Sequence, residues 1–301
     1  MKKLIALILT LTMLLTAAFA TAEAFTLVAP TGAPALAVAT LAVENPDSYN
    51  FITADTIGAE FAKNEADFII APINAGAKLF KAGKSTYQLA AVVTWGNLYF
   101  ASQKADFTLD SLNGAEVTLF GENTINASVV LKVLEAKGIA PAAINYLAGA
   151  AETQAELLSN AEAIVVTADP AVTAAKIKNE NVQTISVQEL LKETMDMDGY
   201  TQAGLFVRAE TLANQPEEVK AYLASVQEAA EKAASDVAAV AEAAVTLEIL
   251  PNAKVANAAI PGCNIRFVPA AEAKEDIAKT VSIDPTQFGG APEDSFFFAA
   301  E

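Results

Sequence analysis

The chain of 301 residues contains no histidine and a single cysteine, Cys263. Histidine is the commonest general base, the commonest metal ligand and the usual base partner of Ser or Cys nucleophiles. One cysteine can form no intrachain disulfide and no cluster that holds zinc or iron and sulfur. We therefore expect no catalytic residues, no metal site and no cofactor. We interpret Cys263 as a small buried hydrophobic residue.

Positive charge is also scarce, because 19 Lys and Arg residues stand against 36 Asp and Glu residues, for a net charge of −17. Neutralising phosphate groups requires a basic surface, so we expect no nucleic-acid partner. Apolar residues make up 53% of the chain, which excludes a disordered acidic protein. The length favours about two domains.

Only the N-terminus has a long hydrophobic run. Lys2 and Lys3 precede the apolar run from residue 4 to residue 15, and small residues follow at the A-x-A patterns of residues 18–20 and 22–24. This pattern predicts a cleaved signal peptide over residues 1–24, and the alternative is an uncleaved membrane anchor. The run is shorter than the ~20 residues that a membrane span needs, which favours the signal peptide. Because no cysteine lies near the cleavage region, we expect a periplasmic or secreted protein without a lipid anchor.

Strands and helices alternate along the rest of the chain. The strands are expected at 25–29, 49–53, 67–71, 116–120, 144–147 and 163–166, with helices at 35–43, 57–64 and 127–137 between them. Continuous apolar strands in such an order indicate parallel sheets that are covered on both faces. The order after residue 116 repeats the order before residue 72, which indicates two similar lobes.

Two extended runs, residues 90–102 and 202–208, flank the second set of elements. They are the two connections that a chain needs if it leaves one lobe, builds a second and returns. We therefore predict an α/β protein with two lobes joined by two crossing strands. Residues 25–100 and 205–301 form lobe 1, and residues 101–204 form lobe 2. A single Ala-rich helix is expected from 216 to 245.

Four turns follow strands and precede helices, at residues 31–33, 73–75, 122–124 and 167–169. In open α/β sheets, ligands bind beyond the carboxyl ends of the strands, where helix N-termini offer free N–H groups. If the lobes face one another, all four turns line one cleft. The alternative is that Thr, Asn and Asp in these turns only cap helices.

Trp95 is the only tryptophan and precedes Gly96 in the first extended run. An aromatic ring beside a hinge can stack on a ligand, and the alternative is that the ring is part of the core.

The predicted turns contain carboxylates but no cation. The only two arginines are Arg208 and Arg266, and both lie outside these turns. A dianionic oxyanion is usually held by Arg, whose planar group matches two oxygens at once. Our hypothesis is a neutral, zwitterionic or cationic ligand whose apolar body rests on Trp95. Its polar ends would contact Thr31, Asn74 and Asn123.

Three segments also carry a resemblance to a known family. They are APINAGAKL at 71–79, VTWGNLY at 93–99, and FGENT at 120–124 followed by residues 131–138, and residues 260–267 and 283–298 echo the family's C-terminal pattern. The chain resembles the solute-binding proteins of ABC importers, in the branch of nitrate, sulfonate, taurine and thiamine-pyrimidine-precursor binders. The resemblance implies a type II periplasmic-binding-protein fold and a monomer. It further implies a protein that closes on a small organic molecule and delivers it to an ABC permease in the inner membrane.

The resemblance also implies positions for the ligand contacts. These are Thr31, Gly32, Ala33, Pro72, Asn74, Trp95, Gly96, Asn97, Glu122, Asn123, Thr124 and Asp169. The chain departs from the family where Asp169 precedes Pro170, because many members have Glu-Pro there. One alternative function is an exported ligand-binding sensor partner without a permease. Another is an enzyme related to thiamine-pyrimidine biosynthesis, which the lack of histidine and the predicted export signal disfavour.

Overall fold

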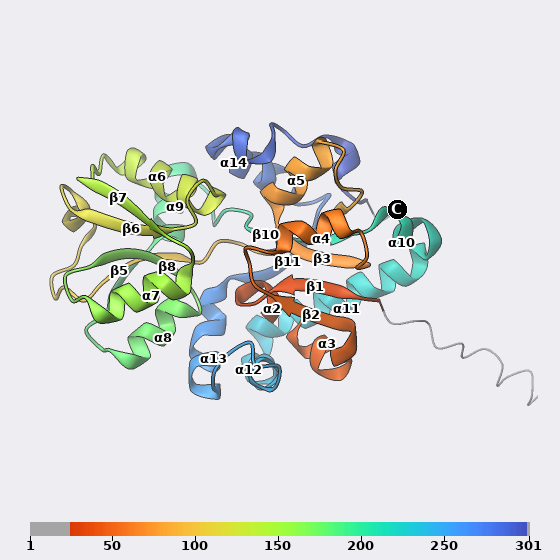
Figure 1. The fold of residues 1–301 in the computed structure, drawn as a ribbon, viewed down its shortest axis with the longest axis horizontal. Coiled ribbons are helices and arrows are strands. Elements are labelled where there is room, and N and C mark those ends of the chain that lie inside the picture. Colours follow the sequence, from red (N-terminus) through yellow and green to blue (C-terminus); the bar gives the residue numbers. More distant parts are fainter. Residues whose placement is uncertain (1–24, 300–301) are drawn as a thin grey trace, which may run out of the picture.

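The computed structural model describes residues 25–299 and shows two α/β lobes side by side, each built on one β-sheet (Figure 1). The predicted signal peptide, residues 1–24, lies outside the described residues. Within the described part of the chain, none of the helices combines the length and the apolar character needed to cross a membrane. The predicted α/β class with two lobes is confirmed.

Sheet A, in the first lobe, has six strands in the order β11-β4-β10-β3-β1-β2. Their bounds are β1 Leu27–Pro30, β2 Tyr49–Ile52, β3 Phe68–Pro72, β4 Gln88–Thr94, β10 Ala203–Val207 and β11 Ile265–Pro269. Strand β1 pairs in parallel with β2 and β3, whereas β10 runs antiparallel to both β3 and β4.

Sheet B, in the second lobe, has five strands in the order β7-β6-β8-β5-β9. Their bounds are β5 Leu98–Ser102, β6 Glu116–Phe120, β7 Ala143–Leu147, β8 Ile164–Ala168 and β9 Gln183–Ser186. Strand β6 is parallel to β7 and β8, and β5 is antiparallel to β8 and β9. In each sheet, three parallel strands are followed by an antiparallel strand next to a crossing, β10 in sheet A and β5 in sheet B. Apart from the additional strand β11, the two sheets therefore have the same strand order, in agreement with the repeat of elements in the sequence.

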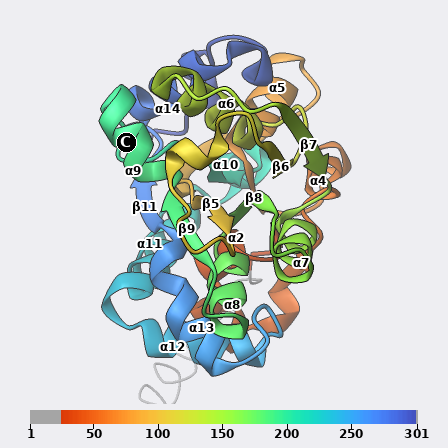
Figure 2. The same ribbon diagram turned by 90° about the vertical axis from the view of Figure 1, so that its left-hand side faces the viewer.

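Helices cover both sheets (Figures 1 and 2). Those of the first lobe are α2 Ala33–Leu36, α3 Ala39–Glu44, α4 Ile57–Lys63, α5 Ile73–Lys81, α10 Ala209–Asn214, α11 Pro216–Ser235, α12 Val237–Thr246, α13 Ala253–Ala259 and α14 Lys274–Ile283. Those of the second lobe are α6 Ile125–Lys137, α7 Ala150–Ser159, α8 Ala171–Lys178 and α9 Val187–Met195. Short 3₁₀ turns are η1 Pro46–Ser48, η2 Leu109–Leu112, η3 Ile260–Cys263, η4 Pro285–Phe288 and η5 Asp294–Phe296.

Strand β3 shows why its sequence is apolar without interruption. Phe68 and Ile70 pack in one cluster with Val219 and Val226 of α11, and Ile69 packs in the cluster on the opposite face with residues of α4 and α5. Successive side chains of a strand point to opposite faces, so a strand covered on both sides needs apolar residues at every position.

The predicted long helix over 216–245 is wrong in one respect, because it is two helices. Helix α11 ends at Ser235, and the Asp236 side chain accepts a hydrogen bond from the Ala239 N–H at the start of α12. Asp is a strong N-cap residue, and its non-helical backbone here starts a new helix. Alanine content alone does not reveal this break, because Ala favours both helices equally.

The chain passes between the lobes at residues 95–97, between β4 and β5. It returns through residues 200–202, immediately before β10. The predicted lobe boundaries fall inside β5 and β10, although each strand belongs entirely to one sheet. The division into lobes at residues 100 and 204 therefore stays a proposal. The crossings at 95–97 and 200–202 lie a few residues before these two boundaries.

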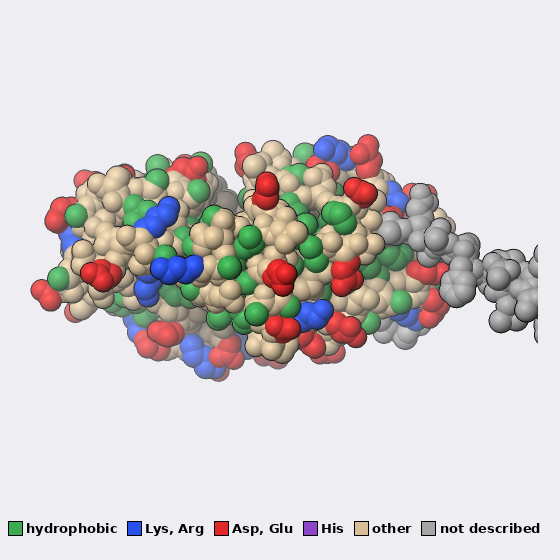
Figure 3. All heavy atoms as spheres, turned by 90° about the horizontal axis from the view of Figure 1, so that it is seen from below, with side chains coloured by type: hydrophobic (Ala, Val, Ile, Leu, Met, Phe, Trp, Pro, Cys, Tyr) green, Lys and Arg blue, Asp and Glu red, His purple; other side chains and the backbone are tan. Residues whose placement is uncertain are grey.

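On the face seen in Figure 3, acidic side chains spread over both lobes with lysines and arginines between them. No broad basic surface is visible on this face. The expectation that nucleic acid is not a partner stays a prediction.

Candidate functional site

The first crossing is a short, buried segment that contacts the turn after β8. Asn97 is 2% exposed, and its Nδ2 donates a hydrogen bond to the Asp169 carbonyl oxygen over 2.7 Å. In return the Asp169 N–H donates to the Asn97 carbonyl oxygen over 3.1 Å. Two of the predicted site segments, 95–97 and Asp169, are therefore brought together.

Trp95 lies in the interior of the crossing. It is 2% exposed, and its Nε1 donates a hydrogen bond to the Arg266 carbonyl oxygen over 2.9 Å. The guanidinium carbon of Arg266 lies 4.0 Å from the centroid of the indole ring. The ring face is therefore occupied by a cation–π contact. This arrangement does not support the hypothesis that the apolar body of a ligand rests on Trp95.

Arg266 also changes the argument about ligand charge. Its position at the start of β11 is next to the end of β4, because Ile265 is in register with Thr94. The other arginine, Arg208, is held by Asp67 at 3.0 Å, whereas no ion pair joins Arg266 to any residue in 25–299. Arg266 lies outside the four predicted turns, as expected, but its guanidinium lies over Trp95, which is itself a predicted site residue. An anionic group on the ligand is not disfavoured.

The return crossing adds residues that the sequence analysis missed. The Tyr200 hydroxyl donates to Asn126 Oδ1 of α6 over 2.6 Å, and Gln202 Nε2 donates to Asn97 Oδ1 over 3.2 Å. Tyr200 is fully buried, and burial raises the pKa of its hydroxyl, so the group is a neutral donor. These side chains connect both crossings with the second lobe. No motif in residues 196–202 predicts these contacts, because the partners Asn126 and Asn97 are distant in the chain.

Asp169 follows β8 and is 5% exposed. Burial raises the pKa of its carboxyl group, although hydrogen bonds from Thr173 and Tyr99 act in the opposite direction. The Thr173 N–H donates to Oδ1 over 3.3 Å, so the side chain caps α8. The same carboxylate packs against the other lobe, because a Cβ built on Gly262 would lie 1.9 Å from Oδ2. Asp169 therefore both caps a helix and fills the contact between the lobes.

We expect Asp169→Asn to change the pH dependence of stability. The pKa of Asp169 is raised in the folded state, so this group contributes stability below about pH 3.8 that is lost as the pH rises through its folded pKa. The Asn variant keeps an oxygen for the Thr173 N–H and lacks this loss. Denaturant unfolding from pH 3.5 to 8 should show a variant whose stability, relative to the parent, increases with pH. A constant difference would contradict the role of the buried charge.

The two predicted turns of the first lobe lie at the carboxyl ends of β1 and β3. Thr31 is exposed, Gly32 has φ +95°, and Ala33 is buried at the start of α2. Pro72 ends β3, and Asn74 lies in the first turn of α5. The Oδ1 atom of Asn74 is buried and accepts no hydrogen bond from a described residue. A buried acceptor without a donor is uncommon in folded proteins, which makes this oxygen a candidate for a ligand contact.

The turn after β6 is the most exposed part of the predicted site. Glu122 and Asn123 are exposed, Asn123 has φ +58°, and the Thr124 hydroxyl donates to the Gly121 carbonyl oxygen over 2.6 Å. Among residues 25–299, no hydrogen bond joins this turn to the turns of the first lobe. The structure therefore places Glu122, Asn123 and Thr124 on the second lobe without a hydrogen bond to the turns of the first lobe in the described chain.

A second contact between the lobes lies near this turn. The Ser128 hydroxyl of α6 donates to Asp284 Oδ2 over 2.8 Å, and Asp284 caps η4 in the first lobe. The hydrogen bond from Ser128 is one of several that lower the pKa of the Asp284 carboxyl group. The lobes are therefore joined by Ser128 and Asp284 at one place and by Asp169 and Gly262 at another.

No group of three or more His, Cys, Asp or Glu residues in the described chain is placed to hold a metal ion. Cys263 is buried, and burial raises the pKa of its thiol, as does the nearby Asp169 carboxylate. A protonated buried thiol is a poor nucleophile, in agreement with a structural role.

The comparisons with known proteins agree with this architecture. Residues 99–238 match the family model described as NMT1/THI5 like. The structure of an ABC transporter from Parabacteroides distasonis superposes with a TM-score of 0.76 and 18% identity, over 93% of this chain and 100% of that chain. The periplasmic aliphatic sulphonate binding protein SsuA from Escherichia coli superposes with a TM-score of 0.70 and 15% identity, over 93% of both chains. The alkanesulfonate-binding protein SsuA from Xanthomonas axonopodis pv. citri, bound to MOPS, gives 0.64 and 13%, over 89% of this chain and 94% of that chain.

No curated protein matches the chain by sequence. At these identities the solved structures establish the fold. The resemblance to ABC-transporter solute-binding proteins and the predicted periplasmic-binding-protein fold are confirmed.

Proposed function

We propose that this protein is an extracytoplasmic solute-binding protein. It closes on a small organic molecule and delivers it to an ABC import permease in the inner membrane. It is a monomer without catalytic activity or cofactor, and it acts in the periplasm or after secretion. The observation that carries the proposal is the pair of similar lobes joined by two short crossings, with turns at the carboxyl ends of both sheets.

Closure as the binding step is supported by small polar contacts between the lobes, which lie beside the packing of α8 against α13. Ser128 and Asp284, Tyr200 and Asn126, and Asp169 and Gly262 are each small contacts that a rigid-body rotation at residues 95–97 and 200–202 would break or re-form. Domain closure of this kind is a general means of enclosing a ligand. Moving from mostly open to mostly closed requires roughly 5.5 kcal/mol of differential affinity.

The ligand would meet donors and acceptors on the first lobe. Asn74 supplies a buried acceptor without a partner, and Arg266 supplies an exposed guanidinium without an ion pair in the described chain. A molecule that carries an N–H or O–H donor and an anionic group, such as a zwitterionic sulfonate, would match both. The proposed ligands also include neutral organic molecules with an N–H or O–H donor for Asn74.

The function is tested by calorimetry and small-angle scattering on the purified protein. The panel is MOPS, taurine, a pyrimidine such as the thiamine precursor, polyamines, sulfate and nitrate. We expect one organic compound to bind and to reduce the radius of gyration at saturation. If no compound of the panel binds, or if a bound compound is turned over, the proposal is wrong. A genome neighbourhood with a permease and an ATPase separates the importer from a sensor partner.

We expect Asn74→Ala to raise the stability of the unliganded protein and to weaken ligand binding. Removing a buried acceptor without a partner should increase the free energy of unfolding by about 1 kcal/mol. Losing one hydrogen bond to the ligand should raise Kd about tenfold. Urea unfolding and calorimetry measure the two effects.

Asn257→Ala is the matched control, because Asn257 is an exposed helical Asn on α13 that bonds to the Ala253 carbonyl. It should leave Kd unchanged. A variant at position 74 that loses stability, or that binds the ligand like the parent, would show that Asn74 Oδ1 has another role.

A further inference from the structure

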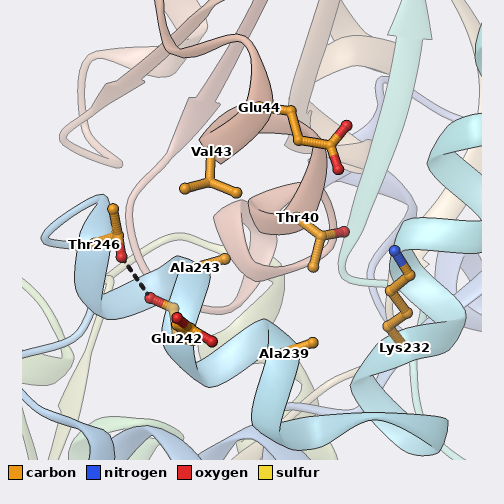
Figure 4. A pocket seen from close by; sticks show the side chains of 8 residues that line it. All are labelled: Thr40, Val43, Glu44, Lys232, Ala239, Glu242, Ala243 and Thr246. Carbon is orange, nitrogen blue, oxygen red and sulfur yellow. Dashed lines mark hydrogen bonds between the residues drawn. The ribbon is translucent and has the colours of Figure 1, made fainter.

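A cavity of about 270 Å³ lies on the first lobe, between α3, α11 and α12. None of the predicted site residues lines it. Its walls are formed by Thr40, Val43, Glu44, Lys232, Ala239, Glu242, Ala243 and Thr246 (Figure 4). This volume is several times the ~30 Å³ that one water molecule takes in liquid water, so the cavity is large enough for a small organic molecule.

Thr40 is the polar group in the floor of the cavity. The residue is 8% exposed, and its Oγ1 atom is buried without a hydrogen-bond partner in the described chain. In Figure 4 the hydroxyl points toward the side of the cavity where Lys232 lies. Buried hydroxyls are almost always hydrogen-bonded, and leaving one unsatisfied costs about 1–3 kcal/mol. The hydroxyl therefore has the capacity for a partner that comes from outside the chain.

Charges of both signs surround this hydroxyl. Glu44 lies one helical turn after Thr40 on α3, and Lys232 reaches toward the same space from α11 (Figure 4). No ion pair within 4.0 Å involves Lys232 or Glu44 among residues 25–299. The two groups face the cavity without neutralising each other.

The remaining wall is largely apolar. Val43 and the alanines at 239 and 243 contribute methyl groups, and Ala243 is buried. Glu242 lies on the far side of the cavity, next to Thr246, whose hydroxyl donates to the Glu242 carbonyl oxygen over 2.9 Å. A ligand would thus meet a polar corner at Thr40, Glu44 and Lys232, and an apolar surface beyond it.

We propose that this cavity binds a free amino acid with a short apolar side chain. The ligand carboxylate accepts hydrogen bonds from Lys232 Nζ and Thr40 Oγ1, and the ligand ammonium donates to the Glu44 carboxylate. The side chain packs against Val43, Ala239 and Ala243. Each ligand charge meets one opposite charge, and charge-assisted hydrogen bonds are about twice as strong as neutral ones.

Ligands with a single charge fit less well. An amine without a carboxylate leaves Lys232 and the Thr40 hydroxyl without partners. A carboxylate without an amine leaves Glu44 unpaired and adds a third carboxylate to a cavity that already has Glu44 and Glu242. A ligand therefore needs an ammonium and a carboxylate on the same molecule to give Lys232, Thr40 and Glu44 a partner each.

Calorimetry with L-alanine and L-valine, each compared with propionate and ethylamine, tests the proposal on the full chain. We expect the amino acids to bind at one site and the two fragments to bind at least tenfold more weakly. Thr40→Val and Lys232→Met should each weaken amino-acid binding about tenfold. Thr40→Val keeps the shape of the side chain and removes an unsatisfied hydroxyl, so it should not lower the melting temperature.

Lys178→Met is the matched control, because Lys178 is an exposed lysine on α8 of the other lobe. It removes the same charge and should leave binding unchanged. The absence of amino-acid binding overturns the proposal, as does binding that Thr40→Val and Lys232→Met do not weaken. Asn74→Ala should leave this binding intact, so the outcome is independent of the function proposed for the site between the lobes.

Discussion

Gly96→Ala is expected to lower the free energy of unfolding by about 2–5 kcal/mol. Gly96 has φ +58°, a backbone region that costs an L-residue with a side chain about 1–2 kcal/mol. An added Cβ would also lie 2.4 Å from Cε1 of the Tyr200 ring, which is fully buried. Overpacking of a buried site costs typically about 1–3 kcal/mol. Tyr200 would have to move, and its hydrogen bond to Asn126 across the lobes would be lost.

Gly138→Ala is the matched control for this prediction. Gly138 ends α6 with φ +68°, and a Cβ there would contact nothing within 4 Å. This variant should therefore lose only the backbone contribution of about 1–2 kcal/mol. Urea unfolding of both variants measures the difference, which reports the packing of Gly96 against Tyr200. Equal losses in the two variants would show that Tyr200 does not constrain the crossing.

Trp95→Ala should destabilise the protein by about 3–5 kcal/mol, which is typical of removing a large aromatic side chain from a core. The indole is 2% exposed and also donates a hydrogen bond to Arg266. Trp95→Phe keeps part of the volume and loses only the donor and some contact area, so we expect a smaller loss of about 1–2 kcal/mol. Thermal and urea unfolding measure both variants. An alanine variant as stable as the parent would mean that the crossing is not packed around this ring.

The covering of the ring by Arg266 can be tested without ligand. Trp95 is the only tryptophan of the chain, so the intrinsic fluorescence comes from this ring alone. Emission of the folded parent should be little quenched by iodide or acrylamide, because both the core and Arg266 cover the indole. Arg266→Met should increase acrylamide quenching, whereas Arg208→Met should not, because Arg208 contacts Asp67 and Thr211 instead. Equal quenching in the two variants would contradict the stacked arrangement.

The elements that could be predicted from the sequence are those with a local signal. Continuous apolar strands such as 68–71 can only be buried on both faces, and their alternation with helices indicates parallel sheets. The extended run over 90–102 is interrupted at Gly96, where the structure has the crossing between β4 and β5. These signals lie within a few residues of one another along the chain. They are strong enough to predict the fold class and the repeat of the lobes.

The break at Asp236 and the contacts of Tyr200 and Gln202 were not predicted, although the extended run over 202–208 was. Asp236 caps α12 by accepting a hydrogen bond from the N–H of a residue three positions later. In an Ala-rich segment the sequence is equally compatible with a continuous helix that passes through Asp236 without a cap. Tyr200 and Gln202 act through Asn126 and Asn97, which are distant in the chain. Their roles follow from which strands are neighbours, and strand order is a property of the whole fold.

The sequence by itself determined the composition of the interior, the two-lobed α/β order and the turns at the strand ends, because hydrophobic periodicity and turn residues act over short distances. The tertiary structure decided which turns meet. It places Arg266 on Trp95, although their hydrogen bond spans 171 positions, and it buries Asp169 against Gly262 of the other lobe. It also leaves Thr40 and Asn74 with buried oxygens that no described residue satisfies. Whether a polar atom finds a partner depends on side chains that arrive from distant elements, so it is settled only when the sheets and helices are packed.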